Sequence, residues 1–279
     1  MNERGDVTTV IPACVRSKDG AALFERTITS VAEQTVPPGE VLLIDDGSTE
    51  PLHRPHDAAF PIHVVELPNR GPLAARNVGI QLATTEFVHV LDHDDHLSPR
   101  FYEAILSAYA SHPEASLVHG LALYVDPVGN PTGARIPPST PNYRFWRNTL
   151  FELIRLNCVH SVATVFRRSL YQTLGGFRRY ELVCDWDFCL RAATERAVFR
   201  YEPNAVAYHT RHAGQLTSSE RQQELIIEDI EMLSDAQLPL WAEPLRRYKM
   251  RRKRIWLRHL ESLAQQADAM QHLEDASHG

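Results

Sequence analysis

Cysteine is scarce in this 279-residue sequence, and the few cysteines are widely spaced. The four are Cys14, Cys158, Cys184 and Cys189, and no two of them form a C-x-x-C pair. This pattern argues against a disulfide framework and a structural zinc site, and it favours reduced thiols in a cytosolic protein. Residues 1–6 are polar and give no sign of a secretory signal, so the expected location is the cytoplasm.

Long apolar runs, a strong excess of charge and two common nucleotide-binding motifs are also missing. There is no run of 18 apolar residues, and therefore no predicted membrane-spanning helix. The 29 lysines and arginines nearly balance the 35 aspartates and glutamates, which gives no general reason to expect nucleic-acid binding. Neither G-x-G-x-x-G after the first predicted strand nor a Walker lysine motif occurs, so a nucleotide site of those two kinds is not expected.

Alternating apolar strands and amphipathic helices make up the first 125 residues. Buried strands are predicted at residues 7–12, 41–44, 62–67, 87–91 and 117–124, and helices at 20–34, 72–82 and 99–110. Ser98 is the expected cap of the last of these helices. Continuous apolar strands that alternate with helices predict an α/β fold with a mostly parallel sheet covered on both faces.

The rest of the chain is less regular. Residues 126–142 are rich in proline, glycine and threonine, which predicts a long loop of the kind that often forms a lid or binding loop. Further expected elements are a helix at 186–193, one or two short strands within 198–208, and helices at 219–234 and 243–269. Because charge rises beyond residue 218, we expect a main domain at 1–218 and a helical extension at 219–279.

The most informative segment lies at the end of the strand at residues 87–91. Asp92, Asp94 and Asp95 follow it, interleaved with His93 and followed by His96. Like charges rarely crowd the end of a buried strand without a counter-charge, and a divalent metal is the usual one. Since ligands of open α/β sheets bind at the carboxyl ends of strands, the segment predicts a metal site at the edge of the sheet.

Two more polar clusters lie near this segment in the predicted sheet. Asp45 and Asp46 follow the strand at 41–44 and precede Gly47-Ser48. This composition is typical of a turn, but a carboxylate at the end of a buried strand can also contact a ribose or base. Arg76 falls on the helix between the two acidic strand ends. It could be a solvated helix residue, or it could clamp a phosphate.

A third cluster begins with Gly175-Gly176-Phe177 and continues to Asp185 and Asp187. Both aspartates could favour the start of a helix, through capping or through the helix dipole. That reading accounts well for Asp187. Asp185 also suits a carboxylate projected into a cleft, where it could act as a general base.

Together these clusters resemble the inverting family 2 glycosyltransferases of the GT-A fold, which use nucleotide-diphosphate sugars. The resemblance extends over residues 6–218 and rests on six segments in the family's order. They are VIP at 10–12, LIDDGST at 43–49, NRGPLAARNVGI at 69–80, LDHDD at 91–95, GGF at 175–177 and DWDFCLR at 185–191. It implies the GT-A nucleotide-diphospho-sugar transferase fold, with residues 219–279 as a helical extension.

The resemblance also implies roles for single residues on the donor side. Pro12 and Ala13 would line the base pocket, Asp45 and Asp46 would contact the uracil or ribose, and Arg76 would lie near the base and diphosphate. The sequence departs from the family here, since Ala13-Cys14-Val15 stands where tyrosine and asparagine commonly follow the proline.

The metal and the base are implied in the same way. Asp92-His93-Asp94 matches the family's D-x-D motif, so that Asp92, Asp94, Asp95 and His212 are the implied surroundings of a Mn²⁺ or Mg²⁺ ion. Asp185 would be the catalytic base, although the glutamate that usually precedes it is Cys184 here.

The implied activity is a metal-dependent, inverting transfer of a sugar from a UDP-sugar to an acceptor hydroxyl. The acceptor would be a sugar, a lipid-linked sugar or another hydroxyl compound. The departures at Ala13 and Cys184 leave a non-catalytic sugar-nucleotide-binding protein as an alternative. The His93–His96 segment leaves a metal phosphohydrolase as a weaker one.

The tail holds eight basic residues between 246 and 258. One interpretation is a solvated helix whose apolar residues pack on the domain; these are Leu245, Tyr248, Ile255 and Leu260. The alternatives are a peripheral contact with the anionic inner face of a membrane, or a homodimer contact.

Overall fold

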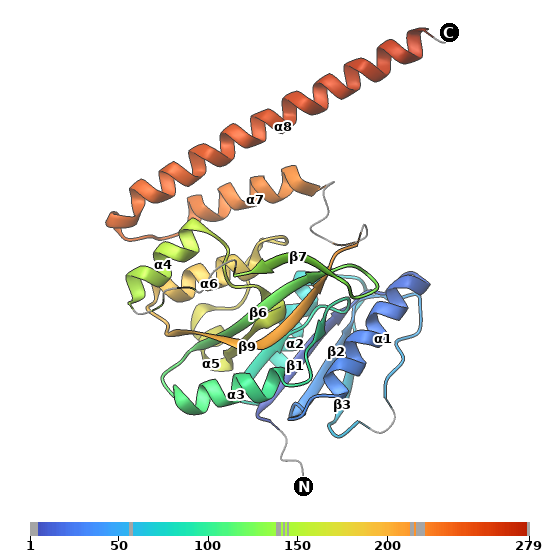
Figure 1. The fold of residues 1–279 in the computed structure, drawn as a ribbon, viewed down its shortest axis with the longest axis vertical. Helices are drawn as coiled ribbons and strands as arrows, with labels where there is room; N and C mark the ends of the chain where they lie inside the picture. Colours follow the sequence, from blue (N-terminus) through green and yellow to red (C-terminus); the bar gives the residue numbers. More distant parts are fainter. Residues whose placement is uncertain are drawn as a thin grey trace.

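A computed structural model describes residues 5–55, 58–137, 141, 143, 145–212, 215 and 221–277. Its strands are β1 (Val7–Ala13), β2 (Glu40–Asp45), β3 (Ile62–Glu66), β4 (Phe87–Val90), β5 (His96–Leu97), β6 (Leu117–Val125), β7 (Pro131–Ile136), β8 (Thr164–Arg167) and β9 (Phe199–Thr210). Its α-helices are α1 (Lys18–Ala32), α2 (Pro72–Leu82), α3 (Phe101–Ser111), α4 (Trp146–Arg155), α5 (Arg168–Leu174), α6 (Cys184–Thr194), α7 (Gln222–Asp235) and α8 (Glu243–Ser277). Figure 1 shows their arrangement around one central sheet.

The strand order is β3-β2-β1-β4-β8-β6-β9-β5, and β7 pairs with β6. The strands β3, β2, β1 and β4 are parallel, as the sequence predicts. Beyond β4 the sheet is mixed, because β8 runs antiparallel to both of its neighbours while β6 and β9 are parallel. The prediction of a mostly parallel sheet therefore describes the amino-terminal half, and the α/β fold as a whole is confirmed.

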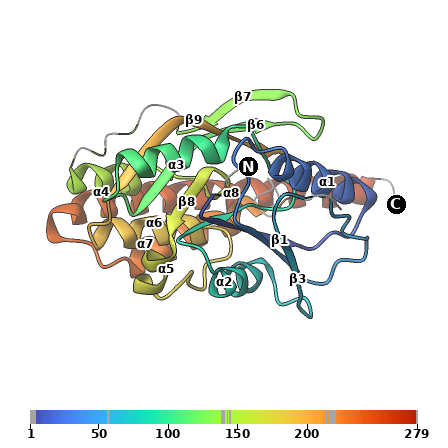
Figure 2. The same cartoon turned by 90° about the horizontal axis from the view of Figure 1, so that it is seen from below.

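Alternate residues of the strands enter two separate cores. Val10 and Ile44 face the core under α2 and α6, whereas Ile11 and Leu43 face the core under α1 and α3. This follows from the two-residue period of a strand. Figure 2 shows α1 and α3 on one side of the sheet and α2 on the other. Burial on both faces explains the continuous apolar runs of these strands.

A glycine sets the position of α2 above the sheet. A Cβ atom at Gly79 would lie 2.2 Å from Cγ1 of Val10 and 3.0 Å from Cγ1 of Ile44. Only glycine permits this approach of helix to strand. It holds Arg76, one turn earlier on α2, close to the carboxyl ends of β1 and β4.

Two local predictions are wrong. Residues 126–142 are not a plain loop, because residues 131–136 form β7, which pairs with β6 as a hairpin; residues 138–140 and 142 lie outside the described part. Ser98 does not cap α3, whose N-cap is Arg100 without a side-chain bond. Instead the Ser98 carbonyl accepts a hydrogen bond from the backbone N–H of Phe101.

The carboxyl-terminal helices pack on the rest of the chain. The two lie side by side, α8 also contacts α4, and Leu245 and Met250 of α8 pack against the core under α6. The far end of α8 extends away from the other elements (Figure 1). No described helix combines the length and apolar character needed to cross a bilayer.

Candidate functional site

A cleft of ≈ 590 Å³ opens at the carboxyl ends of β1, β2 and β4 and is closed on its other side by α6, α7 and α8. The predicted site residues that line it are Pro12, Ala13, Asp46, Arg76, Asp92, His93, Asp94, Asp185 and His212. Parallel pairing explains the convergence, because β1 lies between β2 and β4 in register and their ends meet at one edge. Asp45 and Asp95 do not line this cleft.

The two aspartates after β2 have different tasks. Asp46 is buried, and its two carboxylate oxygens accept hydrogen bonds from the consecutive backbone N–H groups of Arg70 (2.6 Å) and Gly71 (2.7 Å). These bonds fix the loop that precedes α2 and forms one wall of the cleft. Asp45 accepts from the backbone N–H of Ser48 at 2.9 Å, so the turn interpretation applies to Asp45.

Arg76 joins two of the predicted clusters. Its Nη2 donates to both carboxylate oxygens of Asp92, at 2.7 and 2.8 Å, and its Nη1 lies 3.3 Å from Sγ of Cys184. Burial disfavours the charged guanidinium, but Asp92 outweighs burial and raises the pKa of Arg76. The alternative of a solvated helix arginine is therefore wrong. Asp92 in turn is committed to Arg76.

Asp94 and Asp95 point to different places. Asp94 Oδ2 lies 2.8 Å from His212 Nε2 in the wall of the cleft. Asp95 is fully buried; its Oδ1 accepts from the backbone N–H of Thr210 at 2.9 Å, and its Oδ2 lies 3.1 Å from Nδ1 of His209. Burial raises the pKa of Asp95 to about 6 against the opposing effect of His209. Asp95 thus ties the acidic segment to β9 instead of facing the cleft.

The donor set for a metal is small. Within the described residues, no group of three or more His, Cys, Asp or Glu side chains is arranged to hold an ion. The Asp94 carboxylate and the His212 imidazole nonetheless meet at one point of the cleft wall. Mg²⁺ is commonly held by one or two carboxylates together with substrate phosphates, so the Asp94 carboxylate fits the protein's share of such a site, with the His212 imidazole beside it.

Asp185 lies in the first turn of α6 and lines the same cleft. Its Oδ1 accepts from the backbone N–H of Trp186 at 2.7 Å. Burial raises the pKa of Asp185, and the nearby Arg76 only partly opposes this. A carboxylate whose pKa is raised binds a proton more readily, which is the property of a general base.

Asp187 has no place in the cleft. It is buried and pairs with Arg178 and with Arg191, whose Nε lies 2.9 Å from its Oδ2. The reading of Asp187 as a structural residue of the helix start therefore holds. The two aspartates, two residues apart, thus lie in different surroundings.

His96 lies outside the cleft, on β5. Its ring stacks on Tyr208, with 4.6 Å between the ring centroids, and burial lowers its pKa to about 4. His93 lines the cleft, but His96 does not join it there. The two histidines thus do not converge, which counts against a phosphohydrolase site built on them.

Most residues of the far wall of the cleft were not predicted from the sequence. They come from the segment after α4, the segment before α6, α6 itself and the two terminal helices; they include Asn157, Glu181, Trp186, Leu225, Asp229, Lys249 and Lys253. A signal was present, because Leu245, Lys249 and Lys253 are four residues apart and share one helix face. The many charged residues around these positions made the helix look solvated, so this face was not recognised.

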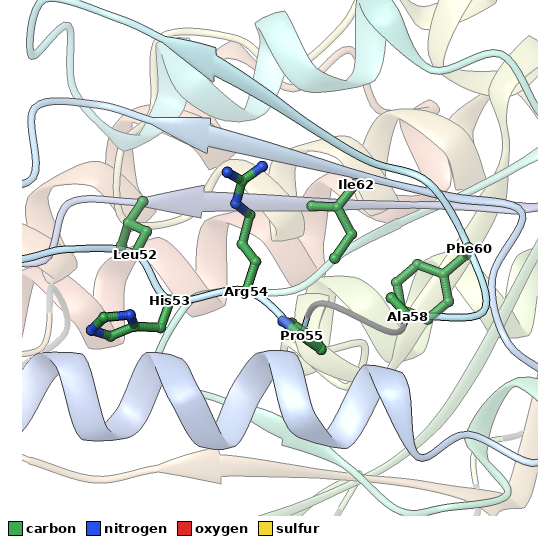
Figure 3. Close-up of a pocket in the computed structure, with 7 residues that line it drawn as sticks. All are labelled: Leu52, His53, Arg54, Pro55, Ala58, Phe60 and Ile62. Atoms are coloured by element: carbon green, nitrogen blue, oxygen red, sulfur yellow. The ribbon is translucent and has the colours of Figure 1, made fainter.

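A second cavity, of ≈ 480 Å³, lies under the segment that joins β2 to β3. Figure 3 shows its lining, with Arg54 reaching toward the strands and His53 placed near the helix. None of the predicted site residues lines this cavity. The cleft at the carboxyl ends of the strands is therefore the candidate active site.

Comparisons with known proteins show what the chain is similar to. A family model described as Glycosyl transferase family 2 matches residues 8–175. A "Pre-mycofactocin glycosyltransferase" of Mycobacterium tuberculosis is 32% identical over 222 residues, which is 73% of this chain and 42% of that protein. The chain thus spans less than half the length of that relative. A "PGL/p-HBAD biosynthesis glycosyltransferase" of Mycobacterium bovis is 29% identical over 75% of both chains.

Solved structures show the same fold. Residues 1–349 of S. aureus TarS, in a crystal structure with UDP-GlcNAc, superpose with a TM-score of 0.63 at 18% sequence identity. The match covers 84% of this chain and 68% of that one. The expected GT-A fold is confirmed by this likeness.

Proposed function

Because the chain belongs to glycosyl transferase family 2, we propose that it transfers a sugar from a UDP-sugar to an acceptor hydroxyl, with inversion at the anomeric carbon. One observation carries the proposal. A single cleft brings together the Asp46-anchored loop, Arg76, the Asp94–His212 pair and Asp185. A nucleotide site, a charge-stabilising site and a base are all needed for such a displacement.

The donor would occupy the side of the cleft formed by Pro12, Ala13 and the loop that Asp46 holds. The buried Nε of Arg76 has no hydrogen-bond partner among the described residues, and an oxygen of a diphosphate would satisfy it. The structural neighbour TarS, which has the same fold, was crystallised with UDP-GlcNAc and with UDP. These observations support a nucleotide-diphosphate sugar as the donor.

The residues of the cleft divide the reaction between them. Asp185 would accept the proton of the acceptor hydroxyl while that oxygen forms its bond to the anomeric carbon. The bond between the anomeric carbon and the diphosphate breaks, and its electron pair goes to the diphosphate oxygen. Attack from the opposite face gives inversion. Asp94 and His212 would hold Mn²⁺ or Mg²⁺, which when bound stabilises negative charge on a leaving phosphate.

Incubation with a panel of UDP-sugars and Mn²⁺, with and without EDTA, tests the proposal. We expect UDP release that EDTA suppresses and that Asp185→Asn lowers by about 10²–10⁴. Release of inorganic phosphate instead would favour a phosphohydrolase. Binding of UDP-sugars with no release in the presence of any hydroxyl acceptor would favour a non-catalytic binding protein.

The outward face of α8 supports a second proposal, a peripheral contact with an anionic membrane surface. Tyr248, Ile255 and Trp256 are 59%, 51% and 48% exposed, so the expectation that Tyr248 and Ile255 pack on the domain is wrong. An arginine stripe, formed by the exposed Arg247, Arg251, Arg254 and Arg258, runs beside Tyr248 and Ile255, whereas Trp256, seven residues after Lys249, lies on the opposite face of the helix. Aromatic and basic residues on one helix face suit the headgroup region of anionic lipid.

Co-sedimentation with vesicles tests this contact. We expect binding to phosphatidylglycerol vesicles, weak binding to phosphatidylcholine vesicles, and loss of binding in both Arg251→Gln/Arg254→Gln and Tyr248→Ser/Ile255→Ser. Equal recovery with both lipids would refute the proposal. A concentration-dependent dimer that these substitutions dissolve would assign the face to a second copy of the chain.

A further inference from the structure

The wall of the cleft beyond Asp185 carries several charged side chains, and nearly all are paired. Lys253 contacts the buried carboxylate of Asp229, and Arg221 lies 3.2 Å from Glu181. Glu152 of α4, which does not line the cleft, pairs with Arg155 at 2.8 Å. Each acid of the wall is thus matched by a base on the same or a neighbouring helix.

Lys249 differs from its neighbours. Among the described residues it has no ion pair with a carboxylate; its Nζ donates to the backbone carbonyl of Arg155 at 3.0 Å and lies 4.0 Å from the centroid of the Trp186 ring. Trp186 directly follows the proposed base Asp185. The ammonium group therefore lies in the wall of the reaction cleft, on the side away from the donor loop.

Two further observations mark this place as a binding site. Burial lowers the pKa of Lys249 to about 7, so the amine lacks the solvation and the counter-charge that would keep it at its usual value. Asn157, which lines the same wall, has a buried Oδ1 with no hydrogen-bond partner in the described part of the chain. Buried polar groups are normally paired, so a ligand that supplies an anion to Lys249 and a hydrogen-bond donor to Asn157 would be stabilised here.

We propose that Lys249 is a specificity residue that binds an anionic group, a phosphate or a carboxylate, of the acceptor. The inference rests on the proposed function for the position of the acceptor. Trp186 provides an apolar surface for the acceptor's sugar or other ring, and Asn157 provides a hydrogen-bond acceptor for a hydroxyl. An uncharged acceptor leaves the ammonium group unpaired in a partly buried wall, which is unfavourable.

Matched acceptors test the inference in the full chain. Glucose, glucose 6-phosphate and glucuronic acid are compared at saturating donor, followed by the same headgroups on a lipid. We expect kcat/KM to be about 10- to 100-fold higher for the anionic acceptor, as a charged hydrogen bond implies. In Lys249→Gln the preference should disappear, while Lys249→Arg and the exposed control Arg252→Gln should keep it. Acceptor-independent UDP release should stay unchanged in the control variant Arg252→Gln.

Amine labelling gives a readout that does not depend on turnover. Acylation of Lys249, followed by mass spectrometry, should slow in inorganic phosphate, whereas acylation of the exposed Lys18 should not. A wild type without UDP release for any donor refutes the proposed function. Equal use of neutral and anionic acceptors, or labelling of Lys249 that phosphate does not slow, refutes the present inference.

Discussion

Two loops on opposite sides of the cleft are held in the same way, by a carboxylate that accepts hydrogen bonds from two consecutive backbone N–H groups. On the donor side, Asp46 accepts hydrogen bonds from the backbone N–H groups of Arg70 and Gly71. On the other side, Glu228 of α7 accepts from those of Glu181 (3.1 Å) and Leu182 (2.7 Å). The first carboxylate follows a central strand, whereas the second comes from the helical extension. The strands therefore shape the side of the cleft proposed for the nucleotide, and the extension shapes the side proposed for the acceptor.

The largest effect is expected at Asp185, between the two loops. Asp185→Asn should lower kcat by about 10²–10⁴, because a positioned base contributes about that factor. The dissociation constant for UDP, measured by titration calorimetry, should not change. Turnover near that of the wild type would remove Asp185 from the role of base.

The donor loop should respond next. Asp46→Asn replaces one acceptor of the two backbone N–H groups by a donor, and a hydrogen bond to a charged group contributes about 1.5–3 kcal/mol. We expect the donor KM to rise about 10- to 100-fold while the acceptor KM stays the same. The comparison of the two loops fails if the acceptor KM changes instead.

The pH dependence of kcat should report the protonation of Asp185, which both sides of the cleft share. Since burial raises the pKa of Asp185, its base form is lost at a higher pH than for an ordinary carboxylate. We expect kcat to fall tenfold per pH unit as pH drops below the raised pKa, and to level off above it. The acidic limb should be identical in Asp46→Asn and Glu228→Gln, and a shift in either would tie that loop to the base.

The smallest effect is expected at Glu228. Glu228→Gln keeps one acceptor oxygen on a half-buried side chain, so a loss of about 0.5–1.5 kcal/mol is expected. The acceptor KM should rise about two- to tenfold with no change in UDP affinity. Asp46→Asn, in contrast, should raise the donor KM and leave the acceptor KM the same. Weaker UDP binding in Glu228→Gln would mean that the two sides of the cleft are not independent.

The donor side could be predicted because its determinants are local. Strands β1, β2 and β4 are recognisable as apolar runs, and parallel pairing brings their ends together, so Asp46, Asp92 and Asp94 had to meet. The different fates of Asp92, committed to Arg76, and of Asp95, committed to β9, depend on side-chain direction. A sequence of alternating acids and histidines does not specify that direction.

The wall proposed for the acceptor could not be predicted in full because tertiary packing decides it. The basic run of α8 has the composition of a solvated helix, yet Lys249 and Lys253 face inward beside Leu245, while Tyr248 and Ile255 face outward. Only the docking of α8 against α7 and α4 determines which side is covered. The family match, which ends at residue 175, gave no guidance there.

The two faces of α8 also set the distance between the cleft and any surface that binds the arginine stripe. A helix with its side chains is about 10–12 Å thick, and α8 presents Lys249 to the cleft on one side and its arginine stripe to solvent on the other. If the stripe lies on a lipid surface, the cleft is held about one helix diameter above the headgroups. An acceptor joined to lipid would then need a spacer of that length between its anchored end and the reacting hydroxyl. The helix would act as a molecular ruler that rejects shorter headgroups before any contact with Asp185 is made.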